Sequence, residues 1–208
     1  MDDILSTMRS TRRGFLQRAV GTVGGVSTLC FGAVGTAASV PSEYEIQLDT
    51  SEQAETEPFG TNTVVDIQTD TDAVNIKAVG SVVGTAARAD GALFGTFTPP
   101  ATAEYSGHCQ YVREGVVNNA AGSGEAAVSV FAREVDGESS GAPLETIQTD
   151  VSGTVTQSGR ITLRKGVKYH VGVIFRVRVT STVAEPFALV DFFDGDRRFE
   201  VQDFRLQL

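Results

Sequence analysis

The chain of 208 residues carries 26 acidic and 17 basic side chains, a formal charge of −9, and its densest basic cluster, residues 160–168, holds only four charges. Phosphate neutralisation needs a basic stripe, so this balance argues against nucleic acid and against an anionic membrane surface as partners. With two cysteines and two histidines, the composition offers no cluster of soft metal ligands.

The first 38 residues have the layout of a secretory signal. Four arginines form a basic start, an uncharged run covers residues 19–42, and small residues at 35–38 offer a cleavage site. The run has about the length of a membrane span, so a retained anchor is the alternative. Its many Gly, Ser and Thr residues make it too weakly apolar for a permanent membrane helix. We therefore predict cleavage near Ala37 or Ala38, which leaves no stable membrane insertion.

The residues before that run carry a specific export motif. Residues 11–16, Thr-Arg-Arg-Gly-Phe-Leu, closely resemble the twin-arginine (Tat) motif Ser/Thr-Arg-Arg-x-Phe-Leu-Lys, with Gln in place of the final Lys. The export-signal residues that carry this resemblance are Arg12, Arg13, Phe15 and Leu16. The resemblance implies that the domain folds in the cytoplasm and is then exported to the extracellular space or the cell surface.

The charge of the exported part points to its solvent. Beyond residue 38 the chain has 13 basic and 24 acidic side chains, and only three of the basic ones are lysines. Acidic excess with scarce lysine is similar to the composition of halophilic proteins, in which salt screens the self-repulsion of such charge. Halophiles favour the twin-arginine route because proteins fold quickly in high salt, so the route does not imply a cofactor.

The remaining residues are enough for one well-buried domain. We expect residues 39–61, rich in Ser, Glu, Thr and Pro, to be a solvated tether, and residues 62–208 to be a single all-β domain. No segment after residue 43 has a convincing helical period. The segments with strand patterns between turn clusters are residues 44–49, 63–69, 73–79, 92–98, 102–113, 126–135, 161–164, 167–180, 187–193 and 199–208.

Residues 167–180 give the clearest strand. Their odd-numbered positions are apolar, whereas His170 and two arginines lie on the even-numbered face, which is the period of a half-buried strand. In residues 199–208 the apolar positions change from odd to even. One inserted residue restores the inward face, so we predict a β-bulge at Gln202–Asp203.

Many short strands joined by turns indicate a β-sandwich. Residues 95–107, GTFTPPATAEYSG, and 163–173, LRKGVKYHVGV, are similar to the strand–turn–Tyr pattern of jelly-roll modules in exported microbial proteins, a resemblance that implies a jelly-roll-like sandwich. Residues 79–88 fit a short helix or a buried strand, and their β-branched residues favour the strand. The Gly-rich and Ser-rich residues 118–124 and 137–143 are expected to be exposed loops.

The two histidines and the cysteine are predicted to be structural or solvated. Neighbouring strand residues face opposite sides, so Cys109 should lie in the core and His108 on a polar face, unable to share a metal ion. Cys109 is the only cysteine beyond the signal, which rules out an intrachain disulfide. His170 is the other histidine, and the chain contains no Gly-x-Ser-x-Gly elbow to supply a nucleophile.

One acidic turn is a candidate metal site. Asp191, Asp194 and Asp196 surround Gly195, and hard carboxylate oxygens around a glycine turn suit calcium. The spacing differs from that of an EF-hand loop, and Asp-Gly turns are also ordinary hairpin corners. Calcium is the one cofactor that the sequence suggests, and no phosphate-binding glycine loop is present.

Sugar recognition normally uses aromatic platforms, and the chain has few. Strand alternation puts Tyr105, Tyr111 and Tyr169 on core faces, which leaves Tyr44 as the tyrosine able to stack on a sugar. Carboxylates are so abundant that a pair suited to glycoside hydrolysis arises by chance.

These patterns favour an exported, non-enzymatic β-sandwich that acts by surface interactions outside the cell or on the envelope, with strand addition at sheet edges as a means of contact. One alternative is a module that binds a glycan or another ligand through loop tips such as residues 118–124. The other is a hydrolase with a two-carboxylate site. The sequence assigns no catalytic or cofactor-binding residue, and it points to a protein or glycan partner at the cell surface.

Overall fold

A computed structural model of the chain describes residues 41–59, 63–80, 86–135, 137–181 and 187–208, so the export signal lies outside the described residues. The described chain is all-β, which confirms the predicted fold class. Nowhere in these ranges is there a helix long and apolar enough to cross a membrane. The strands are β1 Glu43–Glu45, β2 Thr50–Phe59, β3 Thr63–Thr69, β4 Ala73–Gly80, β5 Ala86–Phe97, β6 Ala103–Glu114, β7 Val116–Glu134, β8 Ser139–Ile147, β9 Thr154–Leu163, β10 Tyr169–Ser181, β11 Phe187–Phe192 and β12 Arg198–Gln207.

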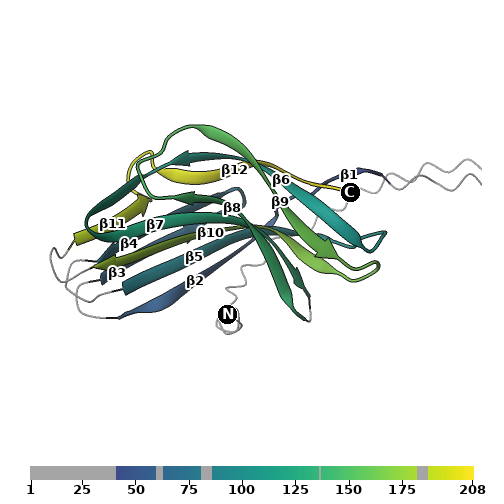
Figure 1. The fold of residues 1–208 in the computed structure, drawn as a ribbon, viewed down its shortest axis with the longest axis horizontal. Helices are drawn as coiled ribbons and strands as arrows, with labels where there is room; N and C mark the ends of the chain where they lie inside the picture. The colour runs from purple at the N-terminus through teal and green to yellow at the C-terminus, as the bar shows by residue number, and fades with distance from the viewer. Residues whose placement is uncertain (1–40, 60–62, 81–85, 136, 182–186) are drawn as a thin grey trace, which may run out of the picture.

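The strands form two antiparallel sheets that pack face to face (Figure 1). Sheet B has the order β2-β5-β10-β7-β8. Sheet A contains β3, β4, β12, β6 and β9, with β1 on β12 and with β11 between β4 and the first part of β7. The long strand β7 therefore belongs to both sheets: residues 116–121 pair in sheet A, and residues 122–134 pair in sheet B.

Alternation along β10 builds the centre of the core. The odd-numbered residues from Tyr169 to Val179 are all buried, as the sequence predicts. Phe175 stacks on Phe199 of sheet A, with ring centroids 4.3 Å apart, and meets Phe192 edge-on at 4.9 Å. These aromatic contacts across the sandwich join the two sheets.

The predicted bulge in the last strand is confirmed. The pairing of β12 with β6 shifts register between Val201 and Asp203, and Phe204 and Leu206 are buried on the even-numbered face. The ambiguous residues 79–88 end β4 and begin β5, in agreement with the strand interpretation, although residues 81–85 lie outside the described residues.

Three segments differ from the expectation. Residues 50–59 of the predicted tether form β2, an edge strand on β5, because its backbone can pair without an apolar face. The predicted loop 118–124 lies within β7, where small residues allow the strand to pass from one sheet to the other. The predicted loop 137–143 supplies the start of β8, whose backbone pairs with β7.

Candidate functional site

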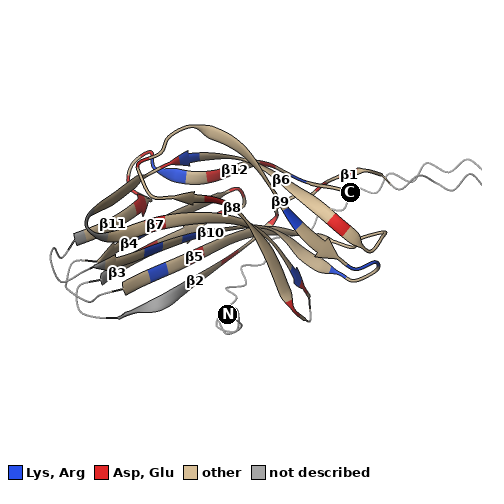
Figure 2. Ribbon diagram, in the orientation of Figure 1, with Lys and Arg blue, Asp and Glu red and all other residues tan. Residues whose placement is uncertain are grey.

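The even-numbered residues of β10 face away from the core and form a charged surface together with their cross-strand neighbours. Figure 2 shows basic segments side by side on β5 and β10. We call this surface the outer face of sheet B. Its residues are Glu52 of β2; Arg88, Asp90, Ala92 and Phe94 of β5; Glu125, Ala127, Ser129, Phe131 and Arg133 of β7; and His170, Ile174, Arg176 and Arg178 of β10.

A buried carboxylate organises the middle of this face. Asp90 accepts hydrogen bonds at both oxygens from Arg88, at 3.1 and 2.6 Å, and again from Arg176, at 2.8 and 3.2 Å. Its side chain is only 6% exposed, whereas that of Arg176 is 40% exposed. Both guanidinium groups are thus fixed in bidentate geometry on one carboxylate, with Arg176 still open to solvent.

The two arginines decide the charge of that carboxylate. Burial by itself raises the pKa of Asp90, but hydrogen bonds from Arg88 and Arg176 outweigh burial and hold the pKa below its usual value. Asp90 therefore stays ionised at neutral pH and anchors both cations.

Arg178 stands beside this cluster. It lies directly opposite Arg88 on β5 and opposite Glu125 on β7, two residues along β10 from Arg176. Its side chain is exposed, and no ion pair joins it to another residue in the described ranges. The face therefore presents three guanidinium groups around one internal carboxylate.

The other half of the face is an aromatic cluster beneath polar groups. Phe94 and Phe131 are 3% and 5% exposed, with ring centroids 6.0 Å apart. The ring of His170 lies 4.8 Å from that of Phe94, and the Arg133 guanidinium is centred 5.6 Å from the same ring. Arg133 also donates hydrogen bonds to both oxygens of Glu52 at 3.0 Å, which holds its guanidinium group in place over the Phe94 ring.

His170 is held in the neutral form. Burial lowers its pKa, and the charge of Arg133 lowers it further against the opposing effect of Glu52. Its Nδ1 lies 3.4 Å from an Arg133 nitrogen that can only donate, so Nδ1 is placed as an acceptor. This contact with a cation differs from a catalytic triad, in which Nδ1 donates to a carboxylate.

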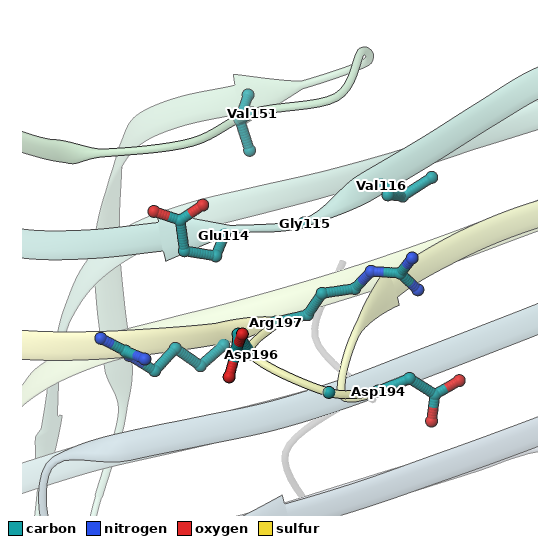
Figure 3. A pocket seen from close by; sticks show the side chains of 9 residues that line it. Glu114, Gly115, Val116, Val151, Asp194, Asp196 and Arg197 are labelled. Atoms are coloured by element: carbon teal, nitrogen blue, oxygen red, sulfur yellow. The ribbon is translucent and has the colours of Figure 1, made fainter.

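A second polar surface is an open cleft of about 620 Å³ at the β11–β12 turn. It is lined by Glu114, Gly115, Val116, Val151 and residues 194–198 (Figure 3). In Figure 3 the carboxylates of Asp194 and Asp196 point in different directions. Glu114 accepts the backbone N–H of Gly153 at 3.1 Å. The cleft thus contains carboxylates and arginines, but the Asp194 and Asp196 carboxylates do not converge on a common point.

The calcium candidates already have protein partners. Asp191, which is 1% exposed, accepts the backbone N–H groups of Phe193 and Asp194 at 2.9 and 3.1 Å and forms an ion pair with Arg197. Asp194 pairs with Lys77 at 2.5 Å, a contact that lowers the pKa of Asp194 and raises that of Lys77. The described ranges contain no group of three His, Cys, Asp or Glu side chains arranged to hold a metal. Calcium at this turn stays a prediction.

The His108–Cys109 pair lies as expected. Cys109 is fully buried, and burial raises its pKa to about 12, so the thiol is inert. His108 lies on the opposite, partly exposed face of β6. The two side chains do not meet.

The tyrosine prediction is correct for the core and wrong for Tyr44. Tyr105, Tyr111 and Tyr169 are buried. Tyr44 is not available for stacking, because its ring packs against Phe97 at 5.1 Å and its hydroxyl oxygen is buried. The pairing of β1 with β12 holds this residue against the sheet.

The sequence interpretation missed the residues that organise the outer face. The signal was present in RADGALF, residues 88–94, where Arg88, Asp90, Ala92 and Phe94 alternate with the core positions. The local pattern does not reveal that Arg176 pairs with Asp90, because Arg176 is 86 residues away in the chain.

No known protein family matches this chain, and no curated protein matches it in sequence. Three of the solved structures that match this chain do so with TM-scores below 0.3. One is the Clostridium thermocellum endo-1,4-beta-D-xylanase 10B CBM22-1-GH10 modules complexed with xylohexaose, at 14% identity, 81% coverage of this chain and TM-score 0.29; this chain spans 28% of that one. The CBM22-1 xylan-binding domain of Paenibacillus barcinonensis Xyn10C has 13% identity, 79% and 92% coverage of the two chains, and TM-score 0.29. Bacteriophage CBA120 tailspike protein 4 has 11% identity, 74% and 20% coverage, and TM-score 0.28. The fold assignment rests on the strand pairing described above.

Proposed function

We propose that the protein is an exported, non-enzymatic β-sandwich that binds a glycan through the outer face of sheet B, outside the cell or on its envelope. The observation that carries this proposal is the Arg88–Asp90–Arg176 cluster on an open sheet face. The twin-arginine resemblance of residues 11–16 supports the export part of the proposal.

A fixed polar surface suits recognition of hydroxyl-rich ligands. Guanidinium and carboxylate groups are planar, and each offers paired donors or acceptors to neighbouring hydroxyls. Asp90 already holds Arg88 and Arg176, and Glu52 holds Arg133. These side chains therefore lose little further conformational entropy when a ligand binds. Ile174, half-buried between these two clusters, offers an apolar contact to the C–H groups of a sugar.

The same geometry supports binding over hydrolysis. A glycosidase acid needs a raised pKa, whereas the pKa values of Asp90 and Asp194 are lowered. His170 faces a cation, and Cys109 is buried with a raised pKa. We therefore expect the bound glycan to be released intact.

A glycan array with the exported protein, read in molar and in low salt, tests this proposal. We expect retention of a defined set of oligosaccharides, without cleavage products in the wash. The Arg176→Ser variant should reduce retention about tenfold or more, because a hydrogen bond to a charged group is removed.

Arg205→Ser is the matched control. Arg205 lies on the outer face of sheet A, is 47% exposed, and pairs with two carboxylates, those of Asp203 and Glu43, which are themselves 31% and 54% exposed. The control should bind like the wild type. Equal losses in both variants, or no retained glycan at all, would contradict the proposed binding face.

A further inference from the structure

The outer face of sheet B reverses the charge of the protein around it. Beyond residue 38 the chain has 13 basic and 24 acidic side chains. The outer face of sheet B instead gathers four arginines against three carboxylates, Glu52, Asp90 and Glu125. In Figure 2 basic segments lie next to each other on β5 and β10. In an acidic protein such a surface is a local attractor for anions.

Three of these arginines, Arg88, Arg176 and Arg178, lie close together, but Asp90 binds only the first two. Like charges directly opposite each other in an antiparallel pair are destabilising, and Arg178 faces Arg88 in this way. Asp90 relieves the repulsion at Arg88 and Arg176, but all four hydrogen bonds it accepts come from these two residues. Arg178 therefore lacks the carboxylate that its two neighbours share.

The nearest acidic alternative does not complete the cluster. Glu125 is the cross-strand neighbour of Arg178 on β7, yet no ion pair joins the two in the described structure. The neighbour of Arg176 on β7 is Ala127, which has no polar side-chain atom. On this side of β10 the guanidinium groups are thus open to an external partner.

We infer that the glycan carries an anionic group, a carboxylate or a sulfate, which binds between Arg178 and the exposed part of Arg176. The inference rests on the proposed function and names its ligand class. A guanidinium group matches both oxyanions through two parallel N–H donors, and two neighbouring guanidinium groups discriminate strongly against a neutral sugar.

Binding of matched oligosaccharides tests this. The probes are a galacturonic acid hexamer and its methyl ester, and a sulfated galactan oligosaccharide and its desulfated form, titrated calorimetrically into the exported protein. We expect at least one acidic member to bind about tenfold or more tighter than its neutral counterpart. The preference should decline as salt rises, and free sulfate at the same concentration should not displace the sugar.

Arg178→Gln is the informative variant, because an exposed side chain without an ion pair in the described ranges can be replaced without disturbing the fold. It should lower the affinity for each acidic probe to that measured for its neutral form. Arg160→Gln is the control: Arg160 is 76% exposed on β9 and pairs with Glu104. It should leave the preference unchanged.

The outcomes separate the two proposals. Equal binding of acidic and neutral probes, or a preference that survives Arg178→Gln, overturns the anionic ligand and leaves the binding face standing. Displacement of the sugar by free sulfate at equal concentration shows a simple anion site and also overturns the inference. If none of the probes binds and the array retains nothing, the proposed function itself fails.

Discussion

Asp90 and Asp191 are the two buried charged residues of the described chain, and they differ in the groups that donate hydrogen bonds to them. Asp191 accepts two backbone N–H groups of its own turn and adds Arg197. Asp90 accepts no backbone group; its four hydrogen bonds come from the side chains of Arg88 and Arg176. One aspartate fixes the backbone, and the other fixes a pair of cations on an open face.

The difference shows how burial of a charge can be interpreted. When a buried carboxylate accepts hydrogen bonds from nearby backbone N–H groups, its role in the turn accounts for its burial. A carboxylate satisfied by long side chains from two strands holds those side chains at defined positions, which a turn does not need. On this account Asp191 stabilises its turn, and Asp90 positions two arginines of the proposed binding face.

The largest effect is expected at Asp191. Asp191→Ala removes the acceptor of two backbone amides and leaves Arg197 without its partner, so the free energy of unfolding should fall by about 4 kcal/mol. Denaturant unfolding measures this. Asp196→Ala, an exposed change in the same turn, should alter stability by less than about 0.5 kcal/mol. Similar values for both variants would mean that Asp191 does not hold the turn.

A smaller loss of stability and a larger loss of binding are expected at Asp90. Asp90→Asn removes the charge between Arg88 and Arg176, which should cost about 3 kcal/mol in unfolding free energy and release both arginines from their fixed positions. Glycan retention should fall with it. Asp191→Ala, measured well below its unfolding midpoint, should bind normally. Normal binding by Asp90→Asn would remove the distinction between the two aspartates.

The same residue gives the protein a pH dependence of known sign. Because the folded pKa of Asp90 lies below its usual value, its contribution to stability is fully present above about pH 4 and is lost as the pH falls through the folded pKa. Unfolding measured between pH 6 and pH 2 should show the gap between wild type and Asp90→Asn narrowing toward acid. A constant gap over that range would contradict the assigned charge state.

The smallest effect is expected from calcium. Asp194 and Asp191 are paired with Lys77 and Arg197, so a calcium ion would have to displace two cations. Calorimetric titration of calcium into the wild type and into the Asp194→Ala, Asp196→Ala double variant should give the same trace. Heat that is present in the wild type and absent from the variant would support a calcium site at this turn.

Sequence reasoning succeeds where the determining contacts repeat along one strand. The period of β10 and the phase change at Gln202–Asp203 follow from the burial of one sheet face, so both can be predicted. It fails at β2, because an edge strand is held by its backbone ladder with β5 and needs no apolar signature.

The candidate site shows the same limit. Asp90 looks like a solvated residue in the sequence, and only the pairing of β5 with β10 brings Arg176 to it. The acidic turn suggests calcium in the sequence, and only the fold brings Lys77, 117 residues from Asp194, to pair with it. Local spacing does not reveal charges that are brought together by strands far apart in the chain.

The most direct test of the binding face is to map amide chemical-shift changes when the best-retained oligosaccharide of the array is titrated into the protein. We predict changes centred on Arg88, Asp90, Arg176 and Arg178, on the central strands of sheet B. Changes centred instead on the cleft at Glu114 and residues 194–198 would contradict the account and move the site to the β11–β12 turn.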